Sequence, residues 1–127
     1  MIKINIKEVM NRLQLNGAYQ PKINQSFIQK IYDLIVENMQ DSNFGVKELA
    51  TKMGVSHSQL YRRIKAKTDK SPAIYCRSLR LQIARKLLLS SNLNISEIAY
   101  RTGFNDPSYF SRAFYKEFGL TPSNLRT

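Results

Sequence analysis

The sequence predicts an all-α protein of seven helices, in which two helix-turn-helix units are joined by one long linker helix. Three observations predict this fold. Apolar residues recur with a helical period, residues that start and stop helices divide the chain, and one segment is repeated about fifty residues later. With 127 residues, 43% of them hydrophobic, the chain can form one ordinary domain with a packed core.

Residues 1–25 are weakly patterned. Three isoleucines near the start alternate with polar residues, as in a short strand, and Gly17 and Pro21 then indicate a linker. We expect this segment to be a linker, the tail of a missing upstream domain, or extra residues left where the chain was cut from a longer protein. Residues 26–127 are expected to form the folded domain.

The first three helices are predicted within residues 24–68. One face of the segment from about 24 to 39 is apolar, with Phe27, Ile31, Leu34, Ile35 and Met39. A short helix is predicted over 46–53 and ends at Gly54, and Ser56 can cap a third helix that runs to about residue 68.

A long linker helix is predicted over 72–89. Ser71 and Pro72 can begin it, because proline suits the first turn of a helix. Its expected apolar stripe consists of Ile74, Leu81, Ala84 and Leu88.

The last three helices are bounded by similar signals. A short helix over 95–102 closes at Gly103, and Asn105 or Asp106 caps the next, which begins at Pro107. That helix runs to residue 118, Gly119 stops it, and Thr121 with Pro122 begins a last helical turn.

The strongest signal is an internal repeat. Residues 46–54 align with 95–103 at an offset of 49, which pairs Glu48 with Glu97 and Ala50 with Ala99. After one inserted residue the match resumes at an offset of 50, and other pairs follow: Leu60 with Phe110, Arg62 with Arg112, Ile64 with Phe114, and Pro72 with Pro122.

Each copy has the chemistry of a helix-turn-helix. Ala50 and Ala99 are small enough for two helices to approach closely, and Gly54 and Gly103 suit a turn that needs a positive φ. We therefore expect helix-turn-helix units over 46–68 and 95–118. The alternative is a plain helical bundle with a duplicated hairpin.

The charge predicts a polyanionic partner. Lysine and arginine number 20 against 9 acidic residues, a net charge of +11, which favours nucleic acid first and an acidic membrane surface second. Nine basic residues between 62 and 86, with Asp69 as the one acid, are expected to coat a phosphate-facing surface: Arg62, Arg63, Lys65, Lys67, Lys70, Arg77, Arg80, Arg85 and Lys86.

The second helix of each unit is expected to lie in a major groove of double-stranded DNA. Leu60, Ile64, Phe110 and Phe114 should face inward. Arginine can donate two hydrogen bonds to guanine, and tyrosine and serine can reach phosphates. The candidate DNA-binding residues are Ser56, His57, Ser58, Tyr61, Arg62 and Lys65 in the first unit, and Asn105, Ser108, Tyr109, Ser111, Arg112 and Lys116 in the second.

Residues 95–122 closely resemble the signature of the DNA-binding domain of the AraC family of bacterial transcription regulators, and the resemblance extends over about 27–126. Arg80, Leu81, Ala84, Leu87 and Leu88 are similar to the family's linker helix. The resemblance implies seven helices, with both recognition helices in successive major grooves, and base contacts from Ser58, Tyr61, Arg62, Ser108, Tyr109 and Arg112.

Two positions depart from the family pattern. Tyr115 stands where a basic residue is usual, which would remove one phosphate contact, and Leu125 stands where an aromatic residue is usual, which would loosen the last helix.

The resemblance also implies a larger protein. Family members usually add a sensing or receiver domain, which residues 1–25 cannot hold, and the helix from Phe27 with its preceding linker looks most like response-regulator and hybrid two-component members. The partners expected are double-stranded DNA, RNA polymerase and an absent upstream domain. Dimerisation is expected in the absent part.

Two other function classes fit less well. An enzyme is not expected, because the single histidine, His57, and the single cysteine, Cys76, form no nucleophile–base pair, and no metal-ligand spacing or cofactor motif occurs. A generic basic module for RNA, lipid or acidic protein would explain the charge but not the repeat. With no disulfide framework, signal peptide or membrane span, we expect a cytoplasmic protein.

Overall fold

The structure is a computed structural model that describes residues 26–127, and the segment predicted to be a linker, 1–25, lies outside the described residues. The described part is all-α, as predicted, with no strand. Its seven helices are α2 (Phe27–Glu37), α3 (Val46–Met53), α4 (His57–Thr68), α5 (Pro72–Ser90), α6 (Ile95–Arg101), α7 (Pro107–Phe118) and α8 (Pro122–Arg126). None of these helices is long and apolar enough to cross a membrane.

The helix starts follow the capping residues of the sequence. Ser56 Oγ accepts a hydrogen bond from the Gln59 N–H at 3.1 Å, and Ser71 caps α5 one residue before Pro72. One predicted start, that of α2 near residue 24, was wrong by three residues, and the structure decides between the two caps predicted for α7. Ser26 caps α2, so that helix begins at Phe27 rather than at 24, and Asp106 rather than Asn105 caps α7.

Both predicted turns have the backbone that they require. Gly54 has φ 69° and Gly103 has φ 90°, in the left-handed region that favours glycine. Ala50 and Ala99 are buried at the crossing of the paired helices. The repeat in the sequence is therefore a repeat of two helix-turn-helix units, α3–α4 and α6–α7.

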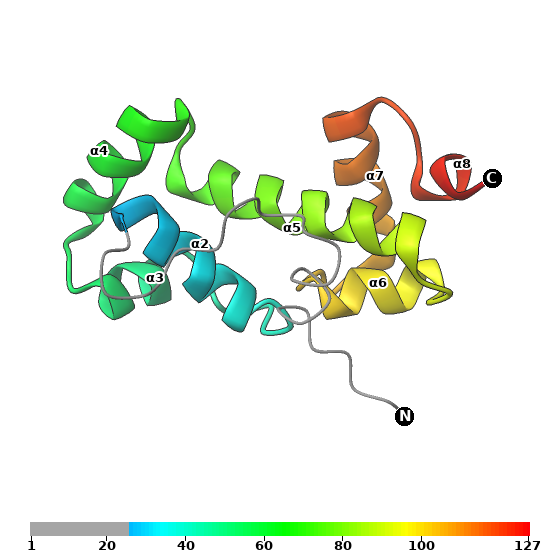
Figure 1. The fold of residues 1–127 in the computed structure, drawn as a ribbon, viewed down its shortest axis with the longest axis horizontal. Coiled ribbons are helices and arrows are strands. Elements are labelled where there is room, and N and C mark those ends of the chain that lie inside the picture. The colour runs from blue at the N-terminus through cyan, green and yellow to red at the C-terminus, as the bar shows by residue number, and fades with distance from the viewer. Residues whose placement is uncertain (1–25) are drawn as a thin grey trace.

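The long helix α5 runs through the middle of the molecule, with α2, α3 and α4 at one end and α6, α7 and α8 at the other (Figure 1). The predicted stripe was wrong in one residue, because Ile74 is 46% exposed. Since both units pack on α5, its buried residues lie on several sides rather than on one stripe: Cys76, Ser78, Leu79, Arg80, Leu81, Ile83, Ala84, Leu87 and Leu88.

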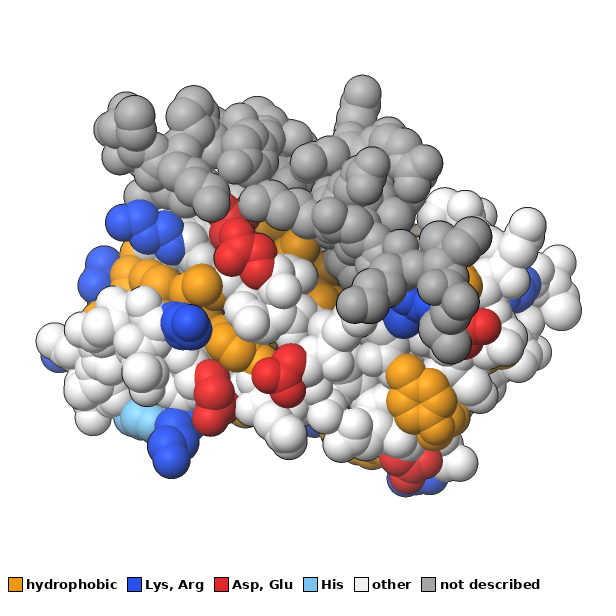
Figure 2. Space-filling view, turned by 90° about the horizontal axis from the view of Figure 1, so that it is seen from below, with side chains coloured by type: hydrophobic (Ala, Val, Ile, Leu, Met, Phe, Trp, Pro, Cys, Tyr) orange, Lys and Arg blue, Asp and Glu red, His pale blue; other side chains and the backbone are white. Residues whose placement is uncertain are grey.

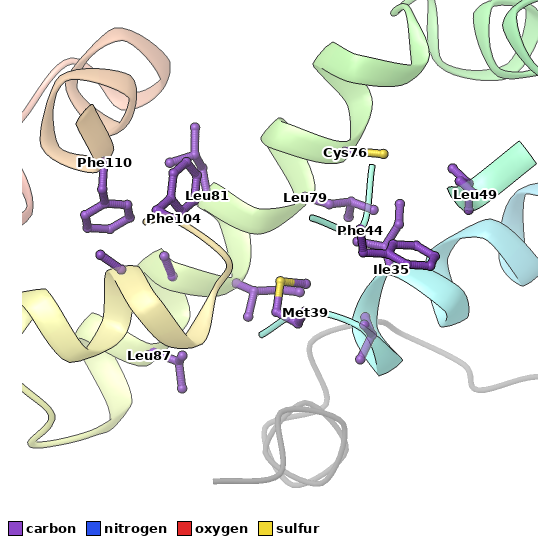
Figure 3. Packing of buried hydrophobic residues seen from close by; sticks show 14 of the residues in the cluster. Ile35, Met39, Phe44, Leu49, Cys76, Leu79, Leu81, Leu87, Phe104 and Phe110 are labelled. Atoms are coloured by element: carbon purple, nitrogen blue, oxygen red, sulfur yellow. The ribbon is translucent and has the colours of Figure 1, made fainter. Parts of the chain in front are cut away.

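The core continues from one unit to the other along α5. In Figure 3, Leu79 lies toward Phe44 and Ile35 of the first half, and Leu81 lies beside Phe104 of the second. The residues expected to face inward from the two recognition helices, Leu60, Ile64, Phe110 and Phe114, are fully buried. Each such side chain contributes about 1.5–3 kcal/mol to folding, so the recognition helices are held firmly on the core.

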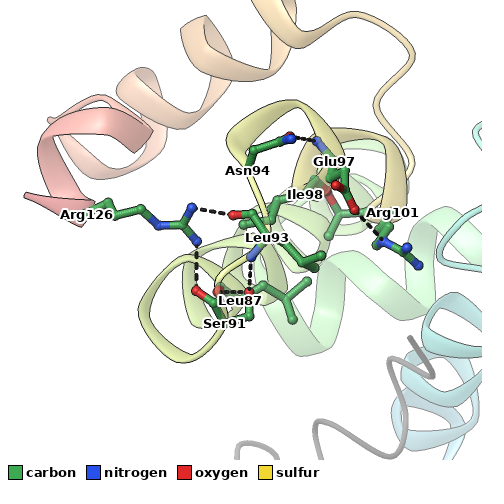
Figure 4. Close-up of polar contacts among 9 residues, drawn as sticks. Leu87, Ser91, Leu93, Asn94, Glu97, Ile98, Arg101 and Arg126 are labelled. Atoms are coloured by element: carbon green, nitrogen blue, oxygen red, sulfur yellow. Dashed lines mark hydrogen bonds and ion pairs between the residues drawn. The ribbon is translucent and has the colours of Figure 1, made fainter. Parts of the chain in front are cut away.

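The last helix is fastened by a polar contact in addition to its half-buried Leu125. The guanidinium of Arg126 donates to the carbonyl oxygens of Leu88, Ser91 and Leu93, at the end of α5 and in the loop after it (Figure 4). These bonds join α8 to the α5–α6 connection, so the leucine in place of an aromatic residue leaves α8 anchored.

Candidate nucleic-acid interface

The first recognition helix, α4, is built to present one polar side. Leu60 and Ile64, four residues apart, hold its inner side on the core. The predicted residues of its outer side are all exposed: Ser56, His57, Ser58, Tyr61, Arg62 and Lys65. Tyr61 is 50% exposed, which leaves its ring and hydroxyl accessible to a ligand.

Ser56 also caps the N-terminus of α4. Its hydroxyl accepts from the Gln59 N–H at 3.1 Å, and its own N–H donates to Gln59 Oε1 at 2.9 Å, which together form a capping box. The hydroxyl of Ser56 still has a hydrogen to donate, for example to a phosphate oxygen.

The second recognition helix, α7, rests on a row of aromatic rings. Ring centroids are 5.2 Å apart for Phe104 and Phe110, 5.7 Å for Phe110 and Phe114, and 4.7 Å for Phe114 and Phe118. The predicted residues on and before this helix are exposed except for half-buried Ser111: Asn105, Ser108, Tyr109, Arg112 and Lys116. Because Ser111 is half-buried, it is less available to DNA than its neighbours.

The two recognition helices open onto adjoining depressions of the surface. One depression is lined by Ser56, His57, Ser58, Gln59, Tyr61 and Arg62 of the first unit, and by Ser71 and Pro72. The other is lined by Asn105, Asp106, Tyr109 and Arg112 of the second unit, and by Arg77 of α5. Val46 and Ala73 line both depressions, so the depression with Arg62 and the depression with Arg112 adjoin each other, and the two together are called the groove below.

Arg77 and Gln59 line this groove although neither was among the predicted DNA-binding residues. Arg77 is half-buried on α5 and belongs to the basic run of the sequence. Nothing in the sequence distinguishes it from the other arginines of that run, because its place depends on how the two units flank α5. Gln59 is engaged in the capping box of α4.

The prediction that the whole basic run faces phosphates was wrong for Arg80, and two further members of the run lie over aromatic rings. The guanidinium of Arg63 lies 3.6 Å from the ring centre of Phe27, and that of Arg85 lies 5.3 Å from the ring centre of Phe118. Arg80 is buried, and burial lowers its pKa. Because Arg80 is buried, at least this member of the run is not available to phosphates.

Acidic and basic side chains occur together on another face of the molecule. Figure 2 shows a face seen from below on which acidic and basic side chains alternate with apolar ones, with no uniform sign. Glu97 and Arg101 of α6 form a salt bridge of 3.7 Å (Figure 4), and neither residue lines the groove. Glu48, the one acidic residue of α3, is also structural, since the hydrogen bond from the Gly45 N–H lowers the pKa of its carboxyl.

His57 and Cys76, the single histidine and the single cysteine, lie in different environments. His57 is exposed at the start of α4. Cys76 is buried, and burial raises its pKa to about 11, so at neutral pH it is a thiol in the packing of α5.

The chain matches known proteins over its folded part. The model of the helix-turn-helix domain family matches residues 49–127. A histidine kinase from Formosa agariphila is 31% identical over 98% of this chain, and the transcriptional activator RhaS from Escherichia coli is 40% identical over 61% of it. The chain spans only 10% and 28% of these two proteins, respectively.

Solved structures agree with this match. The C-terminal domain of the two-component response regulator yesN from Fusobacterium nucleatum is 31% identical with a TM-score of 0.72, and covers 79% of this chain and 97% of its own. An AraC-type regulator from Chromobacterium violaceum is 29% identical with a TM-score of 0.65, covering 78% and 91%. The DNA-binding domain of AdpA, solved with a target DNA, shares the fold at 24% identity and a TM-score of 0.73, covering 80% and 91%. This chain belongs to the AraC family of helix-turn-helix DNA-binding domains.

Proposed function

We propose that residues 26–127 bind double-stranded DNA at specific sequences and thereby regulate transcription, with α4 and α7 in successive major grooves. The observation that carries this proposal is the position of Arg62 and Arg112. They are equivalent residues of two helix-turn-helix units, both are exposed, and they line two adjoining depressions of the surface. An arginine at this position of a recognition helix can donate two hydrogen bonds to a guanine.

The proposed contacts divide into two kinds. Arg62 and Arg112, with Tyr61, Tyr109, Ser58 and Ser108, would read base edges, because they lie on the early and middle exposed turns of α4 and α7. The phosphate backbone would be contacted by Arg77 of α5, which lines the same depression as Arg112, and by six residues of the two units: Lys65, Lys116, Ser56, His57, Asn105 and Ser111.

The length of α5 suits this geometry. Its 19 residues span roughly 28 Å at about 1.5 Å per residue. Successive major grooves on one side of a duplex are about 34 Å apart. A helix of this length can therefore carry two recognition helices to neighbouring grooves.

Selection from a random-sequence duplex library tests the proposal. We expect selected duplexes to contain two conserved blocks about one helical turn apart, and to bind more tightly than scrambled duplexes at the same salt concentration. Equal binding of selected and scrambled duplexes would make the chain a generic polycation and would overturn the proposal.

We further propose that this domain is the output part of a two-component signalling protein. The support is the alignment with a histidine kinase, which covers 98% of this chain, and the likeness to the C-terminal domain of a response regulator. In this proposal an upstream domain receives the signal, and RNA polymerase responds at the promoter. The protein acts in the cytoplasm, and residues 26–127 perform no catalysis. The reading frame upstream of the chain in its own genome should encode a kinase or receiver domain, and an unrelated neighbour there would contradict the proposal.

A further inference from the structure

The guanidinium of Arg80 is buried between the two helix-turn-helix halves and is bonded to four backbone carbonyls. Its Nη1 donates to Met39 O at 2.6 Å and to Thr102 O at 2.9 Å. Its Nη2 donates to Phe44 O at 3.0 Å and to Asp41 O at 3.3 Å. The side chain is only 7% exposed.

These four carbonyls come from both halves of the molecule. Three lie in the connection between α2 and α3, which enters the first helix-turn-helix. The fourth, that of Thr102, ends α6 and lies directly before the turn glycine, Gly103, of the second unit. One side chain of the linker helix therefore holds both units at once.

The surroundings of Arg80 explain how a charge can be buried there. Met39 lies just beyond the C-terminal end of α2, and Thr102 is the C-cap of α6, so two helix ends point their negative partial charges toward the guanidinium. The planar fork of arginine can satisfy several carbonyls in fixed directions, which the single ammonium group of lysine cannot do.

We infer that Arg80 is a positioning residue that sets the distance and rotation between the two recognition helices, and with them the half-site spacing that the protein accepts. The inference rests on the proposed DNA-binding function. The apolar contacts of each unit with α5 are non-directional and tolerate small sliding, whereas hydrogen bonds weaken steeply with angle. All four carbonyls are satisfied only when both units keep their present places.

The guanidinium of Arg80 is also packed against the backbone of the second unit. A Cβ atom on Gly103 would lie 1.5 Å from Nη1 of Arg80, so the backbone of the second unit is in close contact with it. A shift of α6 relative to α2 would therefore disturb the bonds to both.

A duplex-spacing series on the whole chain tests the inference. The probe is a duplex selected from a random library by the unsubstituted chain, with variants that carry one, two or five extra base pairs between its conserved blocks. Two added base pairs rotate one block by about 70° and should weaken binding of the unsubstituted chain about tenfold or more. For Arg80→Lys, this penalty should shrink at least about threefold, because looser units can follow the displaced block.

Arg126→Lys is the matched control. Arg126 also caps three carbonyls, but those of Leu88, Ser91 and Leu93 lie in the last turn of α5 and in the loop directly after it, so Arg126 does not bridge the two units. The control should lose stability while its spacing penalty stays within about twofold of that of the unsubstituted chain. The penalty is a ratio of affinities, so a smaller folded fraction alone does not change it.

Two results would overturn the inference: an unchanged spacing penalty in Arg80→Lys, or an equal reduction in Arg126→Lys. If circular dichroism shows that Arg80→Lys does not fold, the same series is run on Gly103→Ala, which displaces the guanidinium, against Gly54→Ala, where a Cβ meets nothing within 4 Å. There too, equal penalties in the two variants would overturn the inference. Failure of the proposed function is distinguishable, because the unsubstituted chain would then show no preference for any selected duplex.

Discussion

Gly103 lies so close to Arg80 that a Cβ atom on residue 103 would be 1.5 Å from Nη1 of the arginine and 2.7 Å from the carbonyl oxygen of Met39. Gly54 is its equivalent in the first unit and has φ 69°, yet a Cβ there meets nothing within 4 Å. The two turns of the repeat therefore share a backbone shape but differ in what packs against them.

We expect alanine at the two turn glycines to destabilise the protein unequally. Gly54→Ala should cost about 1–2 kcal/mol, the strain of a left-handed alanine. Gly103→Ala should cost at least about 3 kcal/mol, because it also displaces a buried, hydrogen-bonded guanidinium. Urea denaturation of both variants measures the difference, and equal losses would show that Arg80 moves aside freely.

Arg77 should contribute to affinity without contributing to sequence preference. Arg77→Ala should weaken binding to selected and scrambled duplexes alike, and reduce the slope of log affinity against log salt by about 1. Arg85→Ala is the control, because Arg85 lies over the ring of Phe118 and does not line the groove. A loss confined to the selected duplex would instead make Arg77 a base contact.

Cys76 should react slowly while the protein is folded. Burial raises its pKa to about 11, above the ordinary value near 9, so the thiolate that reacts with alkylating agents is scarce at pH 8. Urea should accelerate iodoacetamide labelling by exposing the thiol and returning its pKa to the ordinary range. Labelling of the native protein at the rate of the unfolded chain would contradict the burial described here.

Signals that act within a few residues were predicted well from the sequence. Ser56 and Pro72 begin helices as expected, and Gly54 takes the left-handed turn, because capping and turn preferences depend on local backbone chemistry. Leu60 and Phe110 were identified as inward-facing because the repeat aligns them and the helical period fixes their side.

Features that depend on the arrangement of the helices were not predicted. Ile74 fits a helical stripe in the sequence, but it is exposed because the units pack around α5 elsewhere. Arg80 and Arg63 were placed on a phosphate-facing surface, whereas one holds distant carbonyls and the other stacks on Phe27. Their partners lie 22 or more residues away in sequence, where local periodicity carries no information.

The central claim, that two equivalent recognition helices read two neighbouring grooves, is tested most directly by measuring base preference in Arg62→Ala and Arg112→Ala. Each variant should lose about 1–3 kcal/mol on the best selected duplex and lose preference at one conserved block only, a different block for each variant. The measurement is the affinity for every single-base substitution across both blocks. If both variants relaxed the same block, or weakened selected and scrambled duplexes equally, the two-groove account would be contradicted.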